Sequence, residues 1–236
     1  MLSLRSVNHL MWGLYVLTAV VHIGALLQQV DSLARATQPL FAPLLLGALL
    51  TAVPMRSRTV SLLSLGLLCA WAGDTLGQVG PQHMQTIAAL GFLGALTCYA
   101  LALWPLWLRS RDPLRIMLAI PYGAVVIALF VACADGAGPL LPLVVLYAVA
   151  LTAMAFLSAG GNAWTWMGGT LFLLSSSLLG MDWFLPGAAI AYSTELVMLT
   201  YTVGHGLLIA GMIRTLPGRS DGRHCSSGAA LVIVEP

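Results

Sequence analysis

The residue with the clearest chemical potential is Asp74, a carboxylate inside a long apolar stretch. It lies in the segment Gly66-Leu-Leu-Cys-Ala-Trp-Ala-Gly-Asp-Thr-Leu-Gly77. Gly73 and Gly77 are four positions apart, so they share a helix face beside Asp74 and permit a second helix to approach closely. A desolvated carboxyl at such a contact could act as a general acid or base, or it could simply hydrogen-bond a neighbouring helix.

Other ionisable residues also fall inside apolar stretches. Glu195 is expected at a depth comparable with Asp74, where it could face the same cavity or stabilise a helix N-terminus. His205 and His22 lie near the middle of their stretches and could be either packing residues or proton-transfer groups. We take Asp74, Glu195 and His205 as the candidate catalytic residues.

Hydroxyl groups could line the same pocket. Ser176 belongs to a run of serines expected near the depth of Asp74, although serines in membrane helices commonly hydrogen-bond backbone carbonyls. Tyr99 and Tyr201 could be interfacial residues or hydrogen-bond donors in a pocket. We take Ser176, Tyr99, Tyr201 and the close-contact residue Gly73 as candidate substrate-binding residues.

Several chemistries have little support. The chain has no lysine, which excludes a retinal Schiff base or a lysine nucleophile. No two histidines have the i, i+3 or i, i+4 spacing of a zinc hydrolase, and no second aspartate lies in a span interior, as an intramembrane aspartyl protease requires. The cysteines stand singly and are interpreted as packing residues. We expect no metal and no cofactor.

These residues must be positioned by membrane-spanning helices. Hydrophobic residues make up 59% of the chain and charged residues 8%, with a mean hydropathy of +0.93, which cannot form a soluble surface. A helix needs roughly 20 apolar residues to cross a bilayer, and we count eight such stretches. They are 11–30, 39–54, 59–80, 85–107, 115–134, 139–158, 163–184 and 192–213.

The distribution of arginine predicts the orientation of these helices. Only Arg35 falls on one side of the predicted bundle. Arginine-rich loops favour the cytoplasm, so both termini are expected there, and the net charge of +2 carries no signal for nucleic acid. The arginines of the other side are Arg5, Arg56, Arg58, Arg109, Arg111, Arg115, Arg214, Arg219 and Arg223.

The predicted fold is therefore all-α, a polytopic bundle in one domain. Residues 1–213 form this domain, with the first helix retained, since a small-residue cleavage site is not evident after it. Residues 214–236 are expected to be a disordered cytoplasmic tail. We expect an integral, multi-pass protein of the bacterial inner (plasma) membrane, whose oligomeric state the sequence leaves open.

Several segments, in order along the chain, resemble the lysoplasmalogenase-like (YhhN) family of eight-helix membrane proteins. The segment Gly73-Asp74-Thr75-Leu76 is similar to the glycine–aspartate signature of that family. The other matching segments are Thr37–Pro43, Phe92–Tyr99, Gly168–Ser177 and Tyr201–His205.

The chain also departs from the family pattern. Gln38 stands where a lysine is usual, and the resemblance makes it a further candidate for substrate binding. Leu96 replaces a histidine, and Ser176 replaces the second aspartate. His205 stands where glutamine is common.

The resemblance implies hydrolysis of the vinyl ether bond of lysoplasmalogens, with a lipid or lysophospholipid as substrate. That chemistry needs proton delivery to the enol ether and attack by water, so either Glu195 or His205 supplies the second group or the activity is lost. The alternative is a non-catalytic lipid-binding or assembly protein that kept the family fold. A small-solute or proton-coupled transporter has less support, because internal repeats are not evident.

Overall fold

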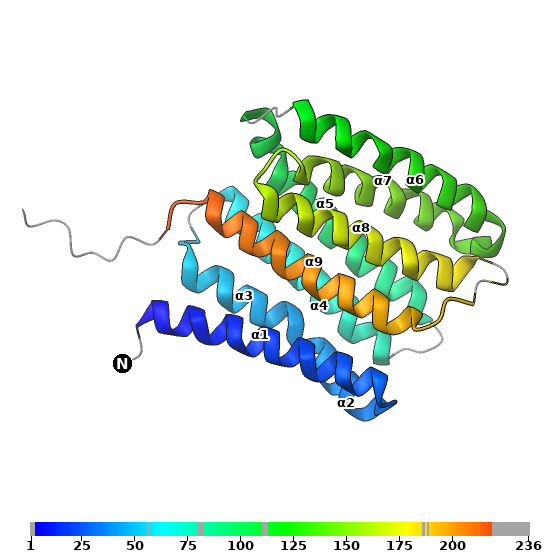
Figure 1. Ribbon diagram of the computed structural model, residues 1–236, viewed down its shortest axis with the longest axis horizontal. Helices are drawn as coiled ribbons and strands as arrows, with labels where there is room; N and C mark the ends of the chain where they lie inside the picture. The colour runs from blue at the N-terminus through cyan, green and yellow to red at the C-terminus, as the bar shows by residue number, and fades with distance from the viewer. Residues whose placement is uncertain are drawn as a thin grey trace, which may run out of the picture.

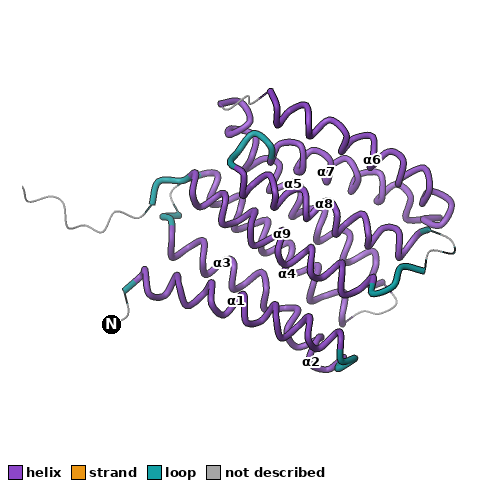
Figure 2. Tube along the Cα trace, viewed as in Figure 1, coloured by secondary structure: helices purple, strands orange, loops and turns teal. Residues whose placement is uncertain are grey.

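The computed structural model describes residues 3–55, 57–79, 83–109, 113–185, 187 and 189–218. Within this part of the chain the regular elements are helices, which confirms the all-α prediction (Figure 2). The last helix continues to Thr215, so the predicted tail shares its first residues with that helix. Outside the described residues lie Arg56, Arg111, Arg219, Arg223 and Cys225.

The helices follow one another with short connections. Two short 3-10 helices, η1 (Gln38–Leu40) and η3 (Gly138–Leu140), lead directly into longer helices. The α-helices are α1 (Leu4–Leu27), α2 (Asp31–Thr37), α3 (Phe41–Ala52), α4 (Arg58–Val79), α5 (Met84–Arg109), α6 (Pro113–Ala137), α7 (Leu141–Ser158), α8 (Ala163–Phe184) and α9 (Ser193–Thr215).

Apolar composition and length make most of these helices able to cross a membrane. Six stretches of the described chain meet both requirements. One of them is 46 residues long and contains both α6 and α7, and α8 is not among the six. The predicted count of eight spans and the cytoplasmic termini stay predictions. The six stretches are Leu4–Leu27, Asp31–Ala52, Arg58–Gln78, Met84–Arg109, Pro113–Ser158 and Ser193–Thr215.

The long helices run roughly antiparallel in one bundle. In Figure 1, α6, α7, α8 and α9 lie side by side, α1 and α3 lie beyond α9, and α5 packs against α4 and α7. The start of α1 and the end of α9 lie at the same end of the bundle, on the left of the view (Figure 1). Arg5 and Arg214 belong to these two segments, whereas Arg35 belongs to α2 at the opposite end.

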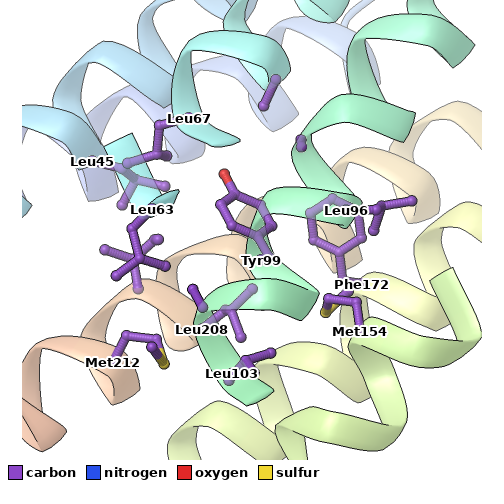
Figure 3. Packing of buried hydrophobic residues seen from close by; sticks show 14 of the residues in the cluster. Leu45, Leu63, Leu67, Leu96, Tyr99, Leu103, Met154, Phe172, Leu208 and Met212 are labelled. Carbon is purple, nitrogen blue, oxygen red and sulfur yellow. The ribbon is translucent and has the colours of Figure 1, made fainter. Parts of the chain in front are cut away.

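The bundle interior is filled by aliphatic and aromatic side chains. Leu45, Leu63, Tyr99, Leu208 and Phe172 are almost fully buried and lie close together where the helices meet (Figure 3). The outward faces are also apolar, and large side chains on α1 are more than half exposed, as a face that meets lipid tails requires.

The second membrane-spanning segment begins earlier in the structure than the sequence predicts. We predicted one segment over 39–54, but α2 and η1 precede α3, and Pro39 lies at the start of η1. Pro43 falls in the first turn of α3, where the missing N–H removes no helical hydrogen bond. Arg35 lies in α2 and Gln38 in η1, at the end of the bundle away from the start of α1 (Figure 1).

Candidate functional site

A cavity of about 420 Å³ lies between the helices at the end of the bundle that carries α2. Side chains from α1, α2, α4, α5, α7, α8 and α9 line it. Its mouth holds Asp31, Arg35 and Asp182, all of which are exposed. Buried polar groups lie deeper in the cavity, so its wall changes from charged and solvated to desolvated.

Asp74 is the buried carboxyl of this cavity, and its side chain is only 4% exposed. The Tyr201 hydroxyl donates a hydrogen bond to Asp74 Oδ2 over 2.8 Å, and Gln38 Nε2 donates to Oδ1 over 3.1 Å. Gln78 in turn donates from Nε2 to Gln38 Oε1 over 3.2 Å, which orients the Gln38 amide. Both carboxyl oxygens therefore have a hydrogen-bond donor, which compensates the cost of burying them.

Small residues let α4 and α5 approach each other beside Asp74. A Cβ atom added to Gly91 of α5 would lie 2.6 Å from the backbone N and Cα of Gly73. Gly73 itself packs against Phe92, which also lines the cavity. The close contact fixes α4 relative to α5, and with it the position of the carboxyl one residue later.

Aromatic rings hold Tyr201 in place. Its ring makes edge contacts with Phe41, Phe92 and Phe172, with centroids separated by 6.4, 5.6 and 5.6 Å respectively. Each of these pairs is close to perpendicular, the arrangement that aromatic quadrupoles favour. The tyrosine is thereby rigid enough to direct its hydroxyl at Asp74.

His22 of α1 is also buried in the cavity wall, with 1% of its surface exposed. Its Nδ1 lies 2.8 Å from Thr37 Oγ1, and the same hydroxyl lies 2.8 Å from the Leu33 carbonyl oxygen and 3.1 Å from that of Ala34. In the tautomer in which Nδ1 donates to Thr37, Nε2 carries the lone pair, and in the other tautomer the Thr37 hydroxyl donates to Nδ1. Nε2 has no hydrogen-bond partner among the described residues.

Ser176 lines the cavity from α8, as does its neighbour Ser175. The Ser176 hydroxyl lies 3.1 Å from the Tyr147 hydroxyl of α7. Ser175 instead donates to the carbonyl of Val197 on α9 over 2.8 Å, a structural bond between helices. Of these two serines, Ser176 is the one whose hydroxyl is oriented by a side chain of α7, namely Tyr147.

His205 and Tyr99 form a second buried pair, away from the cavity lining. His205 Nε2 lies 2.8 Å from the Tyr99 hydroxyl, and neither side chain has measurable exposure. The His205 ring lies 5.3 Å from the ring of Tyr201, so the pair supports Tyr201 through aromatic packing. His205 Nδ1 has no partner among the described residues.

Glu195 lies in the first turn of α9 and is half-buried. It is not among the residues that line the Asp74 cavity. Its place in the first turn is where the helix dipole favours a negative charge.

The predicted site residues thus fall into two groups. The structure brings Asp74, Gly73, Gln38, Ser176 and Tyr201 to one cavity, and it places Glu195, His205 and Tyr99 outside the cavity lining. Gln78 was not among the predicted site residues, although it follows Asp74 by one helical turn and shares its face. The sequence predicts His22 near the middle of the first apolar stretch, and it indicates only a topological role for Arg35.

The chemical capacity of this arrangement is proton transfer in a desolvated cavity. The described residues include no cluster of three or more histidine, cysteine or acidic side chains able to hold a metal ion. The cavity instead combines a buried carboxyl, an imidazole nitrogen with a lone pair and several amide and hydroxyl donors. A cation at the mouth could bind an anionic ligand group.

The comparisons with known proteins give one match. The model of the YhhN family matches residues 33–212, which cover most of the chain and include Asp74, Tyr201 and Ser176. Neither the search of curated proteins nor the search of solved structures gave a match. On the strength of the family match, this chain belongs to the YhhN family.

Proposed function

We propose that this protein is a lysoplasmalogenase-type membrane hydrolase, which cleaves the vinyl ether bond of a single-chain lipid. The observation that carries the proposal is the Asp74 carboxyl, buried in the cavity wall and held by Tyr201 and Gln38. Family membership supports the proposal, because it agrees with the resemblance stated from the sequence. The inner (plasma) membrane of a bacterium is the location we propose, since an arginine-biased helical bundle suits it.

The reaction begins with protonation of the enol ether. The Asp74 carboxyl gives its proton to the outer carbon of the C=C bond, and the electron pair of the ether oxygen forms the oxocarbenium ion. Water then adds to the carbon beside that oxygen and loses a proton to a base. The resulting hemiacetal loses its hydroxyl proton to the Asp74 carboxylate and breaks the C–O bond to glycerol, and the leaving oxygen takes the proton held by the base. A fatty aldehyde and the glycerol hydroxyl of the head group are released, and both protein groups regain their starting protonation states.

A second group must accept the proton from water. His22 suits this role, because a neutral imidazole carries a lone pair on one ring nitrogen, its Nε2 has no partner among the described residues and its side chain lines the cavity. Glu195 and His205 stay alternatives for it, although neither lines the cavity. Tyr201 and Gln38 act as positioning residues that orient the Asp74 carboxyl.

The second candidate function is non-catalytic lipid binding or assembly. The observation that favours it is the Ser176 hydroxyl, which lies 3.1 Å from Tyr147 at the position where the resembling family carries its second carboxylate. A serine hydroxyl does not replace a carboxyl in proton transfer at neutral pH. Under this alternative the cavity binds a lysolipid without converting it.

An assay of aldehyde release from lysoplasmalogens separates the two functions. The purified protein is incubated with choline and ethanolamine lysoplasmalogens, and Asp74→Asn is compared with the matched control Asp135→Asn. Asp135 is an exposed carboxyl on α6 that does not line the cavity. Aldehyde release that survives in Asp135→Asn and disappears in Asp74→Asn supports the hydrolase, whereas saturable lysolipid binding without aldehyde release supports the alternative.

A further inference from the structure

A second, smaller cavity of about 110 Å³ lies between α5, α6, α7 and α8. Its walls are almost entirely apolar and include Leu129, Val144 and Phe184. The hydroxyl-bearing side chains in its lining are Tyr147, Ser176 and Ser177. Charged side chains are not among its described lining residues, in contrast with the Asp74 cavity.

The two cavities are contiguous. They share a wall at the point where the Tyr147 and Ser176 hydroxyls meet. The polar cavity therefore ends at this hydrogen-bonded pair, and the apolar cavity begins there. The shared lining residues are Ala88, Phe92, Tyr147, Ser176, Leu179 and Trp183.

The apolar cavity also adjoins a groove on the outside of the bundle. It shares Val126, Phe130 and Ala148 with a groove of about 470 Å³ between α6 and α7. Ile127 and Val149 in this outer groove are 65% and 63% exposed, so the groove faces the surroundings of the bundle. Three adjoining spaces thus extend from the polar cavity to the outer face of α6 and α7.

A larger apolar groove elsewhere does not connect with Asp74. The groove between α1 and α9 has a volume of about 840 Å³ and contains Gly24, Val20 and Val203. None of its described lining residues also lines the Asp74 cavity. Size alone would favour this groove, but continuity with the polar site favours the cavity between α5 and α8.

We infer that the hydrocarbon chain of the lipid lies in the apolar cavity between α5 and α8, with its far end in the outer groove of α6 and α7. This inference rests on the proposed function, because the vinyl ether is the first part of the chain and must reach Asp74. The rest of the chain then continues into the apolar space adjoining the Asp74 cavity. The ligand expected in the apolar cavity is one unbranched hydrocarbon chain attached to a polar head group.

Photolabelling tests the location of the chain without requiring turnover. The probe is a saturated 1-O-alkyl lysophospholipid with a diazirine at the end of its chain, and excess unlabelled lysolipid identifies the specific fraction. Two glycine variants form a matched pair, since a Cβ atom at Gly180 or at Gly24 meets no heavy atom within 4 Å. Gly180→Leu fills the apolar cavity between α5 and α8, and Gly24→Leu fills the groove between α1 and α9.

The expected result is competed labelling of α6, α7 and α8 in the unmodified protein, lost several-fold in Gly180→Leu and retained in Gly24→Leu. Labelling of α1 and α9 that Gly24→Leu removes, or no competed labelling, would overturn the inference. If Gly180→Leu does not fold, the map of the unmodified protein decides alone. Labelling of the apolar cavity without aldehyde release from lysoplasmalogen would retain the inference and reject the hydrolase. Aldehyde release together with labelling of α1 and α9 would retain the hydrolase and reject the inference.

Discussion

The Tyr201 hydroxyl donates a 2.8 Å hydrogen bond to Asp74 Oδ2, joining α9 and α4 through residues 127 positions apart in the chain. Tyr201→Phe removes this donor and keeps the ring that packs on Phe172. Because a hydrogen bond to a charged group contributes about 1.5–3 kcal/mol, we expect kcat to fall about tenfold to a hundredfold. KM is expected to change little, since Tyr201 acts through Asp74.

A second tyrosine variant controls for loss of a hydrogen-bonded hydroxyl that is partly buried. The Tyr122 hydroxyl lies 2.6 Å from Thr170 Oγ1, and Tyr122 does not line the Asp74 cavity. Tyr122→Phe should therefore leave aldehyde release near its original rate. Equal losses of kcat in Tyr201→Phe and Tyr122→Phe would make Tyr201 an ordinary packing residue.

His22 gives the second prediction, because it lines the cavity and leaves Nε2 without a partner among the described residues. His22→Gln should lower turnover about a hundredfold or more, the scale of a lost general acid or base. Steady-state rates of aldehyde release measure this, with Glu195→Gln and His205→Ala assayed beside it.

The outcome separates the three candidates for the base. We expect His205→Ala to act on thermal unfolding, because the buried Tyr99 hydroxyl loses its partner at a cost of about 1–3 kcal/mol. If His22→Gln stays active and either Glu195→Gln or His205→Ala loses turnover a hundredfold, the residue replaced in that inactive variant is the base.

Much of the fold and part of the cavity could be predicted from the sequence. Charged residues are costly in hydrocarbon, so an intramembrane aspartate flanked by glycines indicates a buried helix contact, and Asp74 and Gly73 occupy one. The apolar stretches predicted helices, and most of the described residues are helical.

The remaining features depend on tertiary contacts that one sequence does not encode locally. His205 pairs with Tyr99 across 106 positions, and helical periodicity places neither residue relative to the other. Arg35 lines the cavity from α2, which lies before the predicted start of the second span at residue 39. That boundary misses α2 because Pro39 was interpreted as a helix start, whereas it lies in η1 between two α-helices.

Arg35 provides the third prediction, since it is the arginine among the described residues lining the cavity. Arginine binds phosphate through paired N–H donors, so Arg35→Gln should raise KM several-fold for lysoplasmalogens with little change in kcat. Kinetics at increasing salt should show the same weakening in the unmodified protein. The control is Arg5→Gln, an exposed arginine at the start of α1, and an equal rise in KM in both variants would contradict a role at the mouth.

The contact between Gly91 and Gly73 gives a prediction about stability. Gly91→Ala places a Cβ atom 2.6 Å from the Gly73 backbone, so α4 and α5 must separate. We expect a loss of about 1–3 kcal/mol in the free energy of unfolding, the usual cost of overpacking, together with reduced activity. Thermal unfolding in detergent measures the effect. Gly13→Ala is the control, because an added Cβ there meets no heavy atom within 4 Å, and an equal loss in both variants would disprove a tight contact.

Ser176 provides the last prediction, because it lines the same cavity as Asp74 and stands where the resembling family carries its second carboxylate. If the unmodified protein lacks hydrolase activity, Ser176→Asp should produce aldehyde release, since the cavity supplies room and the Tyr147 hydroxyl can donate to the new carboxylate. Leu96→His is a weaker addition, because Leu96 is fully buried and an unpaired imidazole there costs free energy.

Ser175→Asp is the matched control for that gain of activity. Ser175 is the adjacent serine and also lines the cavity, but its hydroxyl already donates to the Val197 carbonyl. A carboxylate cannot make that bond, so Ser175→Asp should stay inactive and unfold more readily. Aldehyde release in Ser176→Asp alone would show that the cavity retains the geometry of a hydrolase. Inactivity of the unmodified protein and of Ser176→Asp, with lysolipid binding intact in both, would reject the enzyme and leave lipid binding as the function of this cavity.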